Sequence, residues 1–255
     1  MRLNKKQTMK HHITNAICHP ARWGSTLTAL LLLGAFAPAS QGQVLSPSSL
    51  HYGFSYQEWS LKWWQWSLEQ STNRLELVGG PGIPAGPASK VLFLAGVYLP
   101  GPGGVTIATR KITIPAETPL FFPILSSWND NSGCPTFTTY SAHQLAAQVA
   151  GMWSGVTLTS CTIDGVAVPG LRDPATTEYL VQTPAFSYTT AEKDNVLAGF
   201  FGDTCIDGGT TIYPAVAKGV YLLLSPLKPG NHTIHFIGQV GPYLNENITY
   251  DITVE

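Results

Sequence analysis

The sequence predicts a mainly β fold: an antiparallel two-layer β-sandwich of jelly-roll type with two helices, the first rich in tryptophan. Charged residues make up only 11% of the 255 residues, whereas 25 glycines and 19 prolines punctuate the chain. Short runs of β-branched and aromatic residues recur at turn-sized spacing, and only two segments have helical periodicity. Many short strands with few helices are typical of two packed sheets.

The first 42 residues have the order of a secretory signal peptide. Basic residues come first, an uncharged run (LTALLLLGAFA) follows at 27–37, and small residues lead to Gly42. The apolar run is shorter than the roughly 20 residues that a membrane helix needs. We therefore expect cleavage near Gly42, a secreted or periplasmic protein, no membrane span in the mature chain, and a single β-sandwich domain over residues 43–255.

Loss of the signal peptide changes the charge of the chain. It removes five of the 14 basic residues and none of the 15 acidic ones, so the formal charge falls from −1 to −6. A mildly acidic domain with scattered lysines and arginines lacks the basic stripe that nucleic-acid binding requires. We expect no nucleic-acid partner.

The clearest helix begins after Ser55, which forms a capping box with Glu58, and continues to about Glu69. Its aromatic and leucine side chains fall on two stripes, so most of its circumference is apolar and must be enclosed. We expect its tryptophans to pack against a sheet, with Trp64 the ring best placed to line a cleft. A second helix is predicted over residues 141–153.

Strands are predicted between and after these helices. In the last two, alternation places His232, Ile234 and Phe236 on one face of the sheet and His235 on the other, which predicts a closing hairpin. The predicted strands span residues 91–95, 105–114, 119–125, 156–163, 166–168, 179–188, 220–225, 232–240 and 248–254.

Three cysteines remain after export, namely Cys134, Cys161 and Cys205. In an oxidising compartment two of them are expected to pair, and the sequence leaves open which two. Cys134 and Cys161 enclose the shorter, helix-containing loop, so this pair is the preferred disulfide.

Several motifs in order along the mature chain carry a resemblance. The helix contains WSxxWWQW from Trp59 to Trp66, Phe93–Gly96 reads FLAG, and an IPA segment at Ile114 leads into LFFPI at Leu120. The chain ends with PGxHTIHF from Pro229 and with TYDITV from Thr249. Together these motifs resemble an uncharacterised family of exported bacterial proteins. The resemblance implies export and one globular domain.

The best candidate for a ligand site is the segment from Ser127 to Cys134. Trp128, Asn129, Asp130 and Asn131 offer an aromatic ring beside three oxygen-bearing side chains, at the end of an apolar strand. Calcium is an alternative ligand, but a calcium site needs 6–8 oxygens and Asp130 is the one charged residue in this segment. We therefore expect no metal or other cofactor.

Three classes of function remain open. The first is a binding module that holds a carbohydrate or another cell-envelope component through Trp64, the Trp128–Asn131 segment and His235. The second is an extracellular hydrolase or lyase acting on a polysaccharide, with Asp130 or Glu58 working with His235; no pairing of carboxylates supports this class. The third is a structural or interaction protein. Catalytic residues and oligomeric state are not predicted.

Overall fold

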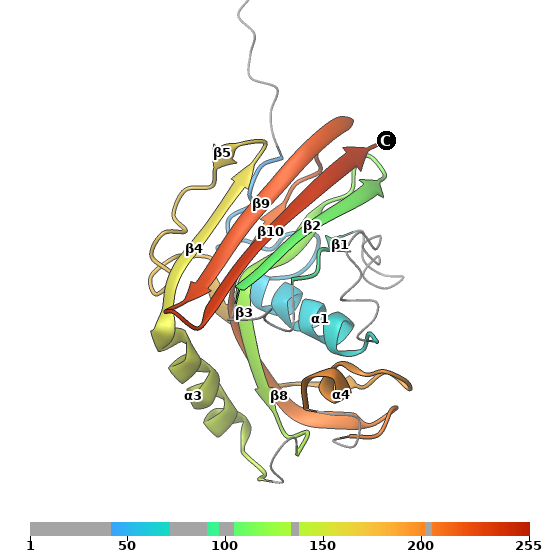
Figure 1. Cartoon of the computed structure of the whole chain (residues 1–255), viewed down its shortest axis with the longest axis vertical. Helices are drawn as coiled ribbons and strands as arrows, with labels where there is room; N and C mark the ends of the chain where they lie inside the picture. Colours follow the sequence, from blue (N-terminus) through green and yellow to red (C-terminus); the bar gives the residue numbers. More distant parts are fainter. Residues whose placement is uncertain (1–41, 72–90, 97–104, 134–137, 202–205) are drawn as a thin grey trace, which may run out of the picture. The chain divides into compact units, whose positions relative to one another are not determined.

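The computed structural model describes residues 42–71, 91–96, 105–133, 138–201 and 206–255 (Figure 1). Contacts divide the chain into two units, residues 1–37 and 38–255, and every described residue belongs to the second. The predicted signal peptide lies outside the described residues except for Gly42, as do Cys134 and Cys205. No helix among the described residues is long and apolar enough to cross a membrane.

The predicted mainly β, two-sheet architecture is confirmed, and the described residues contribute five strands to each sheet. In the first sheet, β7 also pairs with β8, and the other strands run in the order β1, β3, β8, β6. The second sheet has the order β2, β10, β9, β4, β5 (Figure 1). The bounds are β1 Leu92–Phe93, β2 Val105–Ile114, β3 Leu120–Asp130, β4 Val156–Ile163, β5 Val166–Ala167, β6 Leu180–Gln182, β7 Phe186–Thr189, β8 Thr211–Leu224, β9 Gly230–Val240 and β10 Leu244–Val254.

Both sheets are mixed rather than wholly antiparallel. β1 pairs with β3, and β2 with β10, in parallel, whereas the other pairs are antiparallel. Parallel neighbours need a long crossover, and most of the domain lies between β2 and β10 in the sequence. Local sequence patterns carry no trace of such a pairing.

The first sheet is the middle layer of the fold. On one of its faces Phe121 stacks on Tyr221 and meets the rings of the first helix, including Trp59. On the opposite face Phe122 contacts Phe236 of β9, with ring centroids 5.4 Å apart. These rings are almost fully buried, so the core continues through the first sheet from the helix to the second sheet.

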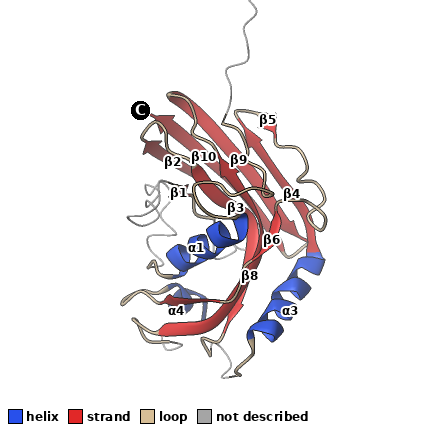
Figure 2. Cartoon of the chain, turned by 180° about the vertical axis from the view of Figure 1, so that it is seen from behind, coloured by secondary structure: helices blue, strands red, loops and turns tan. Residues whose placement is uncertain are grey.

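The two predicted helices are confirmed as α1 (Tyr56–Leu68) and α3 (Ala142–Met152). Both begin with a capping box, at Ser55 and at Ser141, which satisfies backbone N–H groups of the first turn. A 3₁₀ turn follows α3. A third helix, α4 (Val196–Phe201), was not predicted, because six residues are too few for a helical period to be visible. α1 and α3 lie on opposite sides of β8 (Figure 2).

β9 and β10 begin earlier than predicted, at Gly230 and Leu244, and the largest extensions are in β3 and β8. β3 continues through the segment predicted to be a loop as far as Asp130, which pairs with Ala215 of β8, and β8 itself begins at Thr211. The prediction ended β3 where its apolar run ends. Main-chain pairing with β8 extends the strand over polar residues whose side chains bind neighbouring elements.

Candidate functional site

A cavity of about 350 Å³ lies beside the free edge of β3. β1 pairs with β3 only at Leu120 and Phe121, so beyond Pro123 no described strand pairs with this edge. Side chains of α1, α3, β3 and β10 surround the space. The lining residues are Trp63, Trp64, Gly96, Pro123, Ile124, Leu125, Ser126, Ser127, Trp128, Met152, Tyr243, Leu244 and Glu246.

Three tryptophans form a fixed aromatic wall. The Trp64 and Trp128 rings are tilted against each other with centroids 5.0 Å apart, and Trp63 meets Trp64 edge to face at 5.1 Å. Each indole N–H donates to an acceptor within 3.0 Å: Trp63 to the Leu94 carbonyl, Trp64 to the Tyr221 hydroxyl and Trp128 to Asp130. Because the rings are both packed and hydrogen-bonded, this wall is formed before any ligand arrives.

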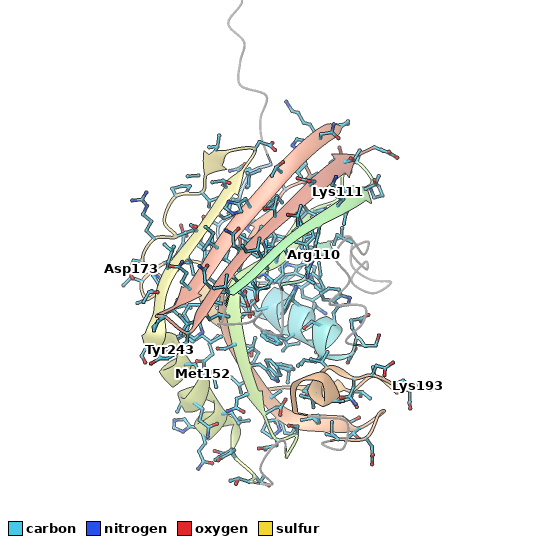
Figure 3. The ribbon with its side chains drawn as sticks, viewed as in Figure 1. Arg110, Lys111, Met152, Asp173, Lys193 and Tyr243 are labelled. Atoms are coloured by element: carbon cyan, nitrogen blue, oxygen red, sulfur yellow. The ribbon has the colours of Figure 1, made fainter. Side chains whose placement is uncertain are left out.

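Two exposed side chains border the cavity. Tyr243, in the turn between β9 and β10, is 80% exposed, and Met152, at the end of α3, is 48% exposed. Figure 3 shows the two next to each other. An aromatic ring and a flexible thioether at the opening leave apolar surface available for contact with a ligand.

Glu246 supplies an acidic group in the otherwise largely apolar lining. It lies on β10 opposite Gly238 of β9, in the alternating set that faces the core together with Ile248 and Tyr250. Burial raises the pKa of this carboxyl to about 8, although the nearby Arg110 guanidinium acts to lower it. At neutral pH Glu246 is therefore mainly a neutral acid, which donates one hydrogen bond and accepts others.

The Arg110 guanidinium is directed at the segment that carries Gly96. It donates to the carbonyl oxygens of Ala95 and Gly96 and to the Tyr250 hydroxyl, at 2.7 Å for the last. These bonds hold the 95–96 segment, part of the cavity wall, against the second sheet.

Ser127 is one of the lining residues, but its hydroxyl does not face the cavity. Its hydroxyl oxygen is buried and has no hydrogen-bond partner among the described residues. The oxygen is shielded from solvent, so it offers no hydrogen bond to a ligand in the cavity.

The structure brings together only two of the six predicted ligand-binding residues, Trp64 and Trp128. Asn129 donates to Gln148 of α3, and Asn131 exchanges two hydrogen bonds with the main chain of Tyr140. Asp130 accepts from Trp128 and from the Tyr188 hydroxyl. These three polar side chains therefore join β3 to its neighbours and do not line the cavity.

His235 lies apart from the cavity. Its side chain is on the outer face of β9, as the alternation predicted, and its ring bonds to Asn247 of β10 at 2.7 Å. Within the described ranges, no group of three or more His, Cys, Asp or Glu side chains is arranged to hold a metal ion.

The preferred disulfide is not formed in this structure. Cys161 is a free thiol, 3% exposed, on the inward face of β4, and Cys134 lies outside the described residues. Burial raises the pKa of the Cys161 thiol to about 12. Side chains of β4 point alternately inward and outward, and Cys161 is one of those that point into the core. The preference for a Cys134–Cys161 pair considered only the length of the enclosed loop and not this direction.

Sequence reasoning did not identify Glu246 or Tyr243 as site residues. One signal was available for Glu246: alternation in the last strand, extended back from Ile248, places residue 246 on the inward face. An acid on that face, ahead of an apolar series, is unusual enough to indicate a site.

Comparison with known proteins gives limited similarity. No family model and no curated protein matches the chain. Two solved structures share limited similarity with it. The cysteine protease inhibitor EhICP2 from Entamoeba histolytica has 12% identity and a TM-score of 0.20, over 59% of this chain and 96% of its own. PbICP-C, solved in complex with falcipain-2, has 11% identity and a TM-score of 0.25, over 66% and 100%. TM-scores this low do not support a transfer of function.

Proposed function

We propose that this chain is an exported binding protein that holds one unit of a carbohydrate of the cell envelope or its surroundings in the cavity beside β3. The observation that carries the proposal is a preformed wall of tryptophan rings that lines one cavity together with a single, partly buried acid. The volume of about 350 Å³ lies within the usual range for small-molecule sites, which are mostly apolar with a few placed polar groups.

The lining suits a sugar ring in particular. A pyranose has an apolar C–H face, which packs on an aromatic ring, and a rim of hydroxyl groups, which need hydrogen-bond partners. Trp128 and Tyr243 offer rings, and Glu246 with the Tyr243 hydroxyl offers polar partners. One side of the ligand is thus met by apolar surface and the other by hydrogen-bonding groups.

Binding is favoured over hydrolysis by the number of carboxyl groups. Glycosidases generally use two carboxyls, about 5–5.5 Å apart in retaining enzymes and about 6.5–9.5 Å apart in inverting ones. Glu246 is the one described carboxyl that lines the cavity. Asp130 is engaged by Trp128 and Tyr188, and His235 lies on the outer face of the second sheet. A hydrolase or lyase remains the second candidate, and a structural role the third.

A glycan array with the purified protein, followed by calorimetry on the glycans that bind, tests the proposal. Tyr243→Ala removes an exposed ring from the opening and is expected to weaken binding about tenfold, or about 1.4 kcal/mol. Tyr213→Ala is the matched control, since Tyr213 is 65% exposed and does not line the cavity. Absence of binding across the array, or an equal loss in both variants, would reject the proposed site.

A further inference from the structure

The polar groups of the cavity are unusual for a site that recognises only sugar hydroxyls. Such sites need several charged or amide side chains, because each hydroxyl both donates and accepts. The described lining holds one charged or amide side chain, Glu246, within a larger apolar surface. Its other polar side chains carry hydroxyl groups, at Ser126, Ser127 and Tyr243, and the Ser127 oxygen is shielded from solvent. This set suits a ligand group that has one strong acceptor beside an apolar substituent.

Aliphatic side chains provide the second half of this environment. Ile124 and Leu125 of β3, Leu244 of β10 and Met152 of α3 all line the same space as the acid. Ile124 and Leu125 are almost fully buried, and Met152 is half exposed. A methyl group placed against them leaves water without leaving a polar group unpaired.

We propose that the cavity recognises an N-acetylated amino sugar, with its acetamido carbonyl oxygen accepting a hydrogen bond from the Glu246 carboxylic acid and its methyl packed against the aliphatic lining. This inference rests on the proposed carbohydrate-binding function and names its substrate class.

The protonation state of Glu246 makes the recognition dependent on pH. The described charged or titratable groups around this carboxyl are Arg110 from β2 and Tyr250 and Tyr243 from β10 and its turn. Burial raises the pKa of Glu246 to about 8 despite Arg110. Below that pH the acid donates to a carbonyl; above it, a carboxylate repels the same oxygen.

Calorimetry with three trisaccharides separates this inference from the proposed function. The probes are the trimer of N-acetylglucosamine, the trimer of glucose with the same linkage, and the trimer of glucosamine. At pH 6 the N-acetylated trimer is expected to bind at least tenfold more tightly than the glucose trimer.

Equal or tighter binding of the glucose trimer would overturn the inference while the carbohydrate-binding function stands. Binding of the glucosamine trimer alone would show that a carboxylate captures an ammonium group and would also overturn it. No binding of any trimer here, together with no binding on the glycan array, would reject both.

Substitution at Glu246 gives the second arm. Glu246→Gln keeps a neutral donor, so it is expected to bind the N-acetylated trimer within about threefold of the wild type at pH 6 and to retain that affinity at pH 9, where the wild type loses at least tenfold. Glu246→Ala is expected to lose at least tenfold at both pH values. Glu255→Gln is the control, at an exposed acid at the chain end. If the alanine variant does not fold, the glutamine variant decides the question. An equal loss of affinity between pH 6 and pH 9 in the wild type and in Glu246→Gln would overturn the role of Glu246.

Discussion

The raised pKa of Glu246, the partly buried acid of the cavity, predicts that the protein loses stability as the pH rises through the neutral range. The pKa of Glu246 is about 8 in the folded chain, against an ordinary value of 4.5. Between these values the folded state holds a proton that the unfolded state has released. Stability therefore falls with rising pH throughout this window, and is independent of this group below about pH 4.5 and above about pH 8.

The size of the effect follows from the width of the window. One bound proton changes the free energy of unfolding by about 1.4 kcal/mol per pH unit. Over the roughly three units between the two pKa values, the loss is on the order of 3–5 kcal/mol. Glu246→Gln carries no ionisable group at this position, so its stability lacks this component. The difference between wild type and variant isolates Glu246 from histidines and other groups that titrate in both proteins.

Urea unfolding followed by circular dichroism at pH 5, 6, 7 and 8 measures this difference. The stability of Glu246→Gln relative to wild type is expected to rise steadily across the series, whereas Glu255→Gln is expected to track the wild type at every pH. A wild type and a Glu246→Gln variant whose stabilities run parallel from pH 5 to 8 would refute the claim that this acid is protonated in the folded protein.

Three further predictions concern groups that hold the site or the core. Tyr221→Phe removes the hydroxyl that accepts from the buried Trp64 indole at 2.7 Å; urea titration is expected to show a loss of about 1–3 kcal/mol, and a loss under about 0.5 kcal/mol would contradict this role. Mass spectrometry after treatment with a thiol reagent at pH 8 is expected to find Cys161 unmodified in the folded protein and modified after denaturation, because burial raises its pKa to about 12; rapid modification in native buffer would contradict its burial. His232→Ala removes a ring bonded to Asp164 at 2.8 Å and is expected to lower the free energy of unfolding by about 1–2 kcal/mol in the same urea assay, so an unchanged midpoint would show that the pair contributes nothing.

Features set by near neighbours in the sequence were predictable. The capping boxes at Ser55 and Ser141 marked the starts of α1 and α3, because their donors and acceptors lie within one helical turn. The alternation of apolar and polar residues predicted β2 and β4, and the predicted bounds are the same as those in the structure. In β9 it also separated the inward Phe236 from the outward His235.

Features set by distant neighbours were not predictable in the same way. β3 extends to Asp130 because β8 pairs with it, and the two strands are about 90 residues apart in the chain. Asn129 and Asn131 resembled ligand-binding side chains, yet their partners Gln148 and Tyr140 come from α3 and the segment before it. A polar residue in a local pattern does not reveal whether its partner is a ligand or another part of the protein.

The cavity combines both cases. Trp64 was placed in it by helical periodicity and aromatic composition, and Trp128 by its position after an apolar strand. Glu246 reaches the same space from a strand more than a hundred residues later, through the pairing of β10 with β2 and β9. The aromatic half of the site was therefore visible in the sequence, and the acid that completes it required the tertiary structure.

The central claim is that a carbohydrate enters the cavity bounded by Trp64, Trp128 and Glu246. Indole N–H resonances in a ¹H–¹⁵N NMR spectrum report on each tryptophan separately during a titration with the N-acetylglucosamine trimer. We expect the signals of Trp64 and Trp128 to shift and saturate together, while those of Trp59 and Trp153, which do not line the cavity, stay in place. Unmoved cavity signals at saturating trimer, or shifts confined to Trp59 and Trp153, would contradict the account.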